Sequence, residues 1–214
     1  MRGPAVQFLT QLSRAADNGK GESYLEYAQK CYRFLKYLEN DNGVFWDLMR
    51  FHKDEENNIT GIDARAGGCF SYNSGTPISS AVELYKATGD EVYLEDAMRW
   101  GRGADAFFAK NSPAEGVKAF TDLPWFREIL LMGYIDLYEF DADALGYIEN
   151  MEGSINYGYE NHRLNGVLGW HKNIIPRDWV DGFRDEDAMK SAVALEQIPC
   201  AGIYASLARF YGNI

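Results

Sequence analysis

The stretch DEVYLEDA at residues 90–97 decides the fold, because an altered copy of it, GESYLEYA, occupies residues 21–28. From the earlier copy onward, apolar or small residues recur at intervals of three, four and three: Leu25, Ala28, Tyr32 and Leu35. The later copy gives the same intervals at Leu94, Ala97, Gly101 and Ala104. This spacing is typical of one face of an α-helix, so the copies predict two equivalent amphipathic helices.

A shorter helix is predicted before each copy, at residues 5–16 and 78–87. Each of these helices runs into a polar turn that contains glycine, as helix ends commonly do. The turns are Asp17-Asn18-Gly19 and Thr88-Gly89-Asp90. The repeated unit is therefore a helical hairpin, and repetition of such a unit predicts a solenoid or a closed toroid.

The second half of the chain is predicted to continue in the same way. Residues 125–140 are apolar on almost every side, which indicates an inner helix, whereas the mixed polarity of 143–159 indicates an outer one. The acidic run at 185–187 should begin a last long helix that Pro199 kinks or divides. We expect the long connections 42–75 and 158–184 to be loops, because strand-like residues occur only in short pieces such as 43–46.

Composition excludes several kinds of partner. The net charge of -11 argues against nucleic acid and anionic membranes, because both need a basic surface. No run approaches ~18 apolar residues, so we expect no membrane span, and no apolar signal segment follows Met1. The three histidines and three cysteines lack metal-site spacing, so we expect neither a metal nor another cofactor.

Candidate chemistry is concentrated in aromatic, acidic and amide residues of the predicted loops. GRGADA at 101–106 resembles a dinucleotide fingerprint but lies in a predicted helix, so we reject that interpretation. Glycoside hydrolysis needs two carboxylates, but spacing selects no pair among those of the loops, which are Asp47, Asp54, Glu55, Glu56, Asp63, Asp178 and Asp181. Residues 69–77, CFSYNSGTP, fit two interpretations equally: a ligand-binding rim, or a capping loop before a helix that begins at Thr76-Pro77.

Residues 70–97 resemble the signature of glycoside hydrolase family 76, the endo-α-1,6-mannanases. In that family a Tyr-Asn-x-Gly loop leads into a helix, and a Thr-Gly-Asp turn precedes Tyr-Leu-x-x-Ala. Here these elements are YNSG at 72–75, TGD at 88–90 and YLEDA at 93–97. Further similar pieces are GPA at 3–5, GVFWD at 43–47, LPWFR at 123–127, and SA at 191–192 with EQ at 196–197.

The resemblance implies an all-α (α/α)6 barrel and a retaining mechanism that uses two adjacent aspartates. The family places that pair N-terminal to the segment that resembles GPA, and this chain contains no Asp-Asp dipeptide. We therefore expect one domain over residues 1–214, a barrel incomplete at its N-terminus with about seven of twelve helices, and no catalytic residue that can be named. Exposed apolar flanks of such an arc predict self-association, packing against a complementary fragment, or marginal stability.

The resemblance also implies an α-mannan-like oligo- or polysaccharide as the partner. It gives six candidate substrate contacts: Trp46, Tyr72, Asn73, Phe126, Arg127 and Trp170. Family relatives usually work outside the cytoplasm, so we expect an extracytoplasmic location, although the chain itself leaves the compartment unknown. The alternatives are a non-catalytic carbohydrate-binding or scaffold protein on the same fold and, ranked last because of the acidic charge, an (α/α)6 enzyme acting on anionic sugars.

Overall fold

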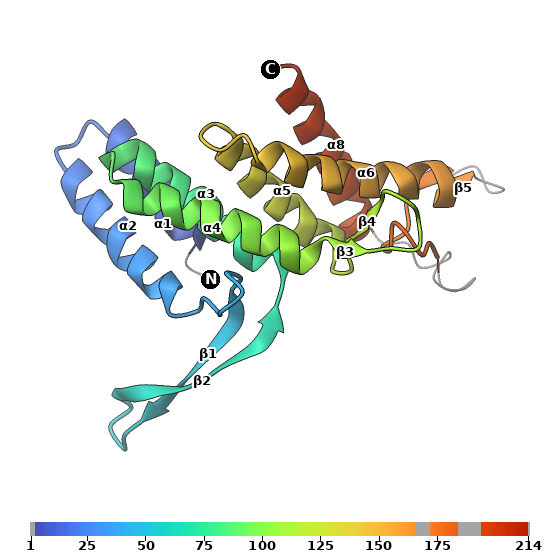
Figure 1. The fold of residues 1–214 in the computed structure, drawn as a ribbon. Helices are drawn as coiled ribbons and strands as arrows, with labels where there is room; N and C mark the ends of the chain where they lie inside the picture. The colour runs from blue at the N-terminus through green and yellow to red at the C-terminus, as the bar shows by residue number, and fades with distance from the viewer. Residues whose placement is uncertain (1–2, 166–171, 184–193, 214) are drawn as a thin grey trace.

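A computed structural model describes residues 3–165, 172–183 and 194–213, and most of these residues are helical (Figure 1). The helices are α1 (Gly3–Ala15), α2 (Gly21–Lys36), α3 (Ser71–Thr88), α4 (Glu91–Phe108), α5 (Pro124–Tyr138), α6 (Ala144–His162) and α8 (Ala194–Tyr211). The strands are β1 (Trp46–Lys53), β2 (Ile59–Cys69), β3 (Lys110–Asn111), β4 (Lys118–Ala119), β5 (Leu164–Asn165) and β6 (Lys172–Ile174). The prediction of a mainly helical fold is confirmed.

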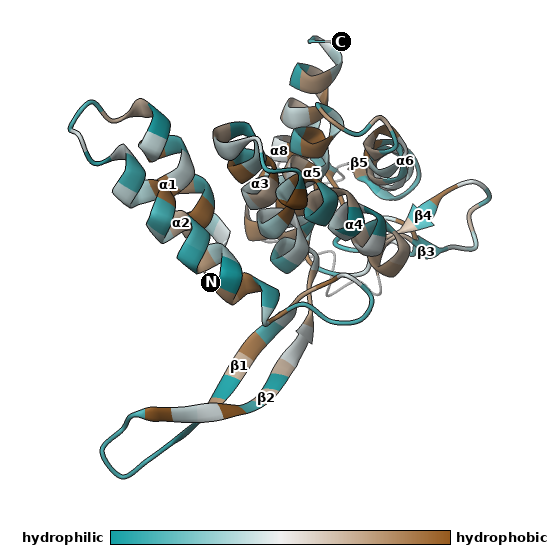
Figure 2. Ribbon diagram, turned by 60° about the vertical axis from the view of Figure 1, so that its left-hand side comes forward, coloured by the Kyte–Doolittle hydropathy of each residue, from teal (hydrophilic) through white to brown (hydrophobic). Residues whose placement is uncertain are grey.

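The described helices form two layers. In one layer α3 packs between α1 and α5, and α5 also packs against α8. In the other layer α2, α4 and α6 pack against α1, α3 and α5 respectively, as Figures 1 and 2 show from two sides. Both predicted hairpins are therefore confirmed, as α1–α2 and α3–α4, and α5 is packed against α3, α6 and α8.

Glycines bring the backbones of α3 and α5 into direct contact. A Cβ atom on Gly75 would lie 2.3 Å from the carbonyl oxygen of Ile129, and one on Gly133 would lie 2.7 Å from the carbonyl oxygen of Gly75. Carbon and oxygen atoms cannot approach so closely, so only glycine allows this crossing. The crossing fixes the beginning of α3, with Tyr72 and Asn73, beside the beginning of α5.

The predicted loop at 42–75 is wrong over most of its length, because β1 and β2 form an antiparallel hairpin that projects away from the helices (Figure 1). The register shifts between Trp46 and Leu48, between Arg50 and Phe51, and between His52 and Lys53. Each shift interrupts the strict alternation by which a strand is recognised in a sequence. Figure 2 shows hydrophobic residues along this projecting ribbon, whose strands, within the described part of the chain, form a sheet of their own.

Two predicted helix ends also need correction. Helix α3 begins at Ser71, not at Thr76, so Tyr72, Asn73 and Pro77 lie inside it. The last helix continues through Pro199 as one element, and its predicted acidic beginning at 185–187 lies outside the described residues. The GRGADA stretch at 101–106 lies within α4, which agrees with the predicted helix and with the rejection of a dinucleotide site there.

Two searches of the described residues gave negative results. Among their helices, none combines the length and the apolar character that crossing a bilayer requires. Within the same ranges, no three or more His, Cys, Asp or Glu side chains gather where they could hold a metal ion.

Candidate sugar-binding site

A short hydrogen-bond cluster joins the first turn of α3 to the base of β1. The Tyr72 hydroxyl donates to Oδ1 of Asp47, and the Asn73 side-chain amide donates to the same oxygen at 3.0 Å. Burial and, after it, the hydrogen bond to Asp47 together raise the pKa of Tyr72 to about 12. The phenol is therefore protonated at neutral pH and remains a donor.

Aromatic rings surround Tyr72. Phe70 is stacked at a centroid distance of 6.2 Å and Trp125 at 5.9 Å, whereas Phe126 lies closer, at 4.5 Å, and is tilted. The rings come from the residue before α3 and from the first turn of α5, which the glycine contact holds together. Three of these rings, Phe70, Trp125 and Phe126, are half-buried, so they present partly exposed faces beside polar groups.

A cavity of about 290 Å³ opens between the beginning of α3, the beginning of β1, the first residue of α1 and the end of α2. Its apolar lining includes Leu35, Leu38, Phe45 and Pro77, and its polar groups include Asp47, Asn73 and Thr76. Trp46 and Tyr72 contribute their rings to the same lining. The volume is at the lower end of the range of about 300–1,000 Å³ for small-molecule sites, so the cavity suits one ring-sized group.

The structure brings three of the six predicted contacts to this cavity: Trp46, Tyr72 and Asn73. Phe126 contacts the Tyr72 ring but does not line the cavity. Trp170 lies outside the described residues. Asp47, one of the loop carboxylates that sequence spacing could not rank, joins the cavity through its bonds with Tyr72 and Asn73, and it belongs to the GVFWD segment that carried the family resemblance.

Arg127 needs a correction, because its side chain is 0 % exposed and therefore cannot touch a ligand in this structure. Its guanidinium donates to the backbone carbonyls of Asp122 and Arg177 and lies 4.1 Å from the centroid of the Trp179 ring. Burial lowers its pKa to about 10, against the influence of the nearby Asp122, so the group is charged at neutral pH. Arg127, which follows the aromatic pair Trp125-Phe126, therefore faces the protein interior.

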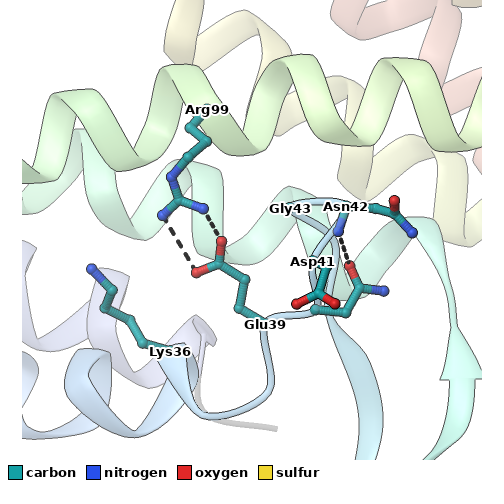
Figure 3. A pocket seen from close by; sticks show the side chains of 7 residues that line it. Lys36, Glu39, Asp41, Asn42, Gly43 and Arg99 are labelled. Carbon is teal, nitrogen blue, oxygen red and sulfur yellow. Dashed lines mark hydrogen bonds and ion pairs between the residues drawn. The ribbon is translucent and has the colours of Figure 1, made fainter.

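A second hollow, of about 460 Å³, lies between the end of α2, the turn at 39–43 and α4 (Figure 3). The Arg99 guanidinium points at the Glu39 carboxylate and bonds it, and it also bonds Asp96 at 2.5 Å. Lys36 bonds the other oxygen of Asp96 at 2.7 Å. Paired charges and the absence of an aromatic ring from its lining distinguish this hollow from the cavity at Tyr72.

The family model that matches the sequence is that of glycosyl hydrolase family 76, and it covers residues 2–142. The chain belongs to glycosyl hydrolase family 76. A search of curated proteins found no match.

Solved structures of family 76 proteins have a similar fold. The chain is 23% identical to a family 76 glycoside hydrolase (mannosidase) of Bacteroides thetaiotaomicron VPI-5482, with a TM-score of 0.74 over 97% of this chain and 53% of that one. An α-1,6-mannanase of Salegentibacter sp. HEL1_6 is also 23% identical, with a TM-score of 0.67 over 96% and 58%. The chain thus spans just over half the length of these relatives.

Two further structures concern inactive variants of the Salegentibacter enzyme, in which two neighbouring aspartates are replaced. One variant was solved with α-1,6-mannotetrose and the other with α-1,6-mannotriose. These ligands belong to that enzyme.

Proposed function

We propose that the chain forms one wall of the substrate groove of a glycoside hydrolase that acts on α-1,6-linked mannan, within an (α/α)6 barrel. The observation that carries the proposal is the cavity bordered by Asp47, Tyr72 and Asn73, with the Trp46 ring in its lining. Membership of family 76 and the mannanase neighbours support it.

The cavity offers both kinds of contact that a sugar ring needs. Sugar C–H faces pack against flat apolar rings, which Trp46 and Tyr72 supply. Sugar hydroxyls donate to carboxylates, and among the described residues both bonds to Asp47 use Oδ1, so Oδ2 is available to accept one. A hydrogen bond to a charged acceptor contributes about 1.5–3 kcal/mol, enough to orient a single ring.

Hydrolysis with retention requires two carboxyl groups about 5–5.5 Å apart. Asp47 is the one carboxylate among the described residues that line this cavity, and the sequence has no Asp-Asp pair. We therefore assign binding, and no catalytic step, to the residues of this chain. The same observation favours the second candidate, a non-catalytic carbohydrate-binding or scaffold protein on the same fold.

Calorimetric titration of the chain with α-1,6-mannotriose, together with an assay for released reducing ends, tests both candidates. Saturable binding without turnover is expected, and Asn73→Ala should weaken it. Asn42→Ala is the matched control, because Asn42 belongs to the second hollow and its loss should leave the affinity unchanged. No binding would refute both candidates, whereas turnover would refute the assignment of binding alone.

We also propose that the chain works outside the cytoplasm and that apolar helix flanks let it self-associate. Support for self-association comes from Phe8 on α1 and from Leu195 and Ile198 on α8, which are 63%, 62% and 70% exposed. Leu195 and Ile198 lie three residues apart on one helix, and large apolar side chains grouped at a surface commonly mark contact sites. Sedimentation velocity over a range of concentrations would detect the association.

A further inference from the structure

The first turn of α3 receives its cap from a distant part of the chain. Phe70, at the N-cap position, makes no capping bond with its side chain. Instead Oδ2 of Asp122, 51 residues further on, accepts a hydrogen bond of 2.8 Å from the backbone N–H of Ser71. The first N–H groups of a helix have no partner within it, so this carboxylate satisfies one of them and complements the positive end of the helix.

Asp122 is itself held in place from the opposite side. Its backbone carbonyl accepts a hydrogen bond from Nη2 of Arg127, which also donates to the carbonyl of Arg177 at 2.8 Å. The ring of Trp179 lies against the same guanidinium. Arg127 therefore links the loop before α5 to the segment 177–179. Asp122 in turn links that loop to α3 through its hydrogen bond with Ser71.

The contact between the two charged side chains is loose. Nε of Arg127 and Oδ1 of Asp122 are 3.6 Å apart, and neither atom has a hydrogen-bond partner among the described residues. The strong bond of the carboxylate is thus the one to Ser71. A buried ion pair with such geometry is a poor source of stability, because the cost of removing both charges from water is not recovered. The position of the Asp122 carboxylate instead suits it to hold the first residue of α3 in place.

We propose that Asp122 is a positioning residue of the sugar site: it anchors Ser71 and so sets Tyr72 and Asn73 against Asp47. The proposal rests on the proposed function, since it treats Tyr72 and Asn73 as sugar contacts. Tyr72 and Asn73 follow the anchored Ser71 by one and two residues in the same helical turn. A shift of the first turn would move both donors relative to Oδ1 of Asp47.

Hydrogen–deuterium exchange of the full chain tests the anchor without any sugar. Asp122→Ala should accelerate exchange in a peptide covering residues 70–76 roughly fivefold, the effect of losing one capping bond. Asp122→Asn should stay near the wild-type rate, because the amide oxygen still accepts from Ser71. Equal rates in the Ala, Asn and wild-type chains would overturn the anchor itself.

Titration with α-1,6-mannotriose tests the link to the site. Asp122→Ala should weaken binding, and the loss should be smaller when Asn73 is already alanine, because part of the effect of Asp122 acts through Asn73. Asp90→Ala is the matched control, since Asp90 caps α4 by accepting from Val92 N at 3.1 Å, and it should lower stability without changing the affinity. Additive losses, or an equal loss in the control, would overturn the positioning role. If the wild-type chain binds no mannotriose, the proposed function fails while the exchange result still decides the anchor.

An unpaired buried Arg127 could prevent the single variants from folding. The exchange experiment is then repeated with Arg127→Met added to the Asp122→Ala chain and to the Asp122→Asn chain. Neither double variant contains a buried guanidinium without its carboxylate partner. The Ala and Asn forms should still differ in exchange at residues 70–76, with the Asn form slower. The same rate in both would contradict the proposal.

Discussion

Replacing Gly75 with alanine should destabilise the protein, although alanine is the better helix former. A Cβ at this position would lie 2.3, 2.6 and 2.7 Å from three backbone atoms of Ile129 and Leu130. Backbone atoms cannot rotate away as a side chain can, so α3 and α5 must separate, and overpacking of this kind costs about 1–3 kcal/mol or more. Because all three contacts are with backbone atoms below 3.0 Å, we expect the upper half of that range, about 2–3 kcal/mol. The helix propensity gained is about 1 kcal/mol, which leaves a net loss of roughly 1–2 kcal/mol.

Gly153→Ala in α6 gives the matched control, because a Cβ there would meet nothing within 4 Å. This variant should gain about 0.5–1 kcal/mol. Urea unfolding followed by circular dichroism measures both changes, and in a thermal scan each kcal/mol corresponds to about 2–4 °C in a chain of this size. A Gly75→Ala chain as stable as the wild type, or changes of the same sign at both glycines, would refute the close crossing of α3 and α5.

Three other predictions concern the site and the exposed flanks. Asp47→Ala should weaken binding of α-1,6-mannotriose roughly 10–100-fold by calorimetry, because it removes a charged acceptor and leaves the Asn73 amide without its partner. The pKa of Tyr72 is about 12, above its ordinary 10.0, so its contribution to stability is complete below pH 10 and is lost as the pH rises through 12. Tyr72→Phe should therefore flatten the fall in the free energy of unfolding over that range, and an unchanged slope would contradict the assignment. Phe8→Glu together with Ile198→Glu should abolish concentration-dependent sedimentation, and persistent association would place the contact elsewhere.

The helical hairpins were predictable because helix periodicity is a local property. The intervals that start at Leu25 and Leu94 need only about one dozen residues to appear, and they correspond to α2 and α4. The β1–β2 hairpin was not predictable, because three register shifts disrupt its alternation and none of its residues is fully buried. The start of α3 was missed for another reason: its cap is Asp122, which no local pattern connects to Ser71.

The candidate site was partly predictable from motifs. Trp46, Tyr72 and Asn73 were named from the family resemblance, and the structure brings them to one cavity. The role of Asp47 depends on a contact between β1 and α3 that only the folded chain reveals. Arg127 was misassigned because an aromatic-basic sequence at a helix start does not indicate whether the charge faces the solvent or the interior.

A crystal of the chain soaked with α-1,6-mannotriose would test the central claim most directly. A mannose ring should occupy the cavity at Trp46, with hydroxyl groups within hydrogen-bond distance of the Asp47 carboxylate and the Asn73 side chain. Sugar bound at another surface, such as the hollow beside Arg99, with this cavity empty, would contradict the account.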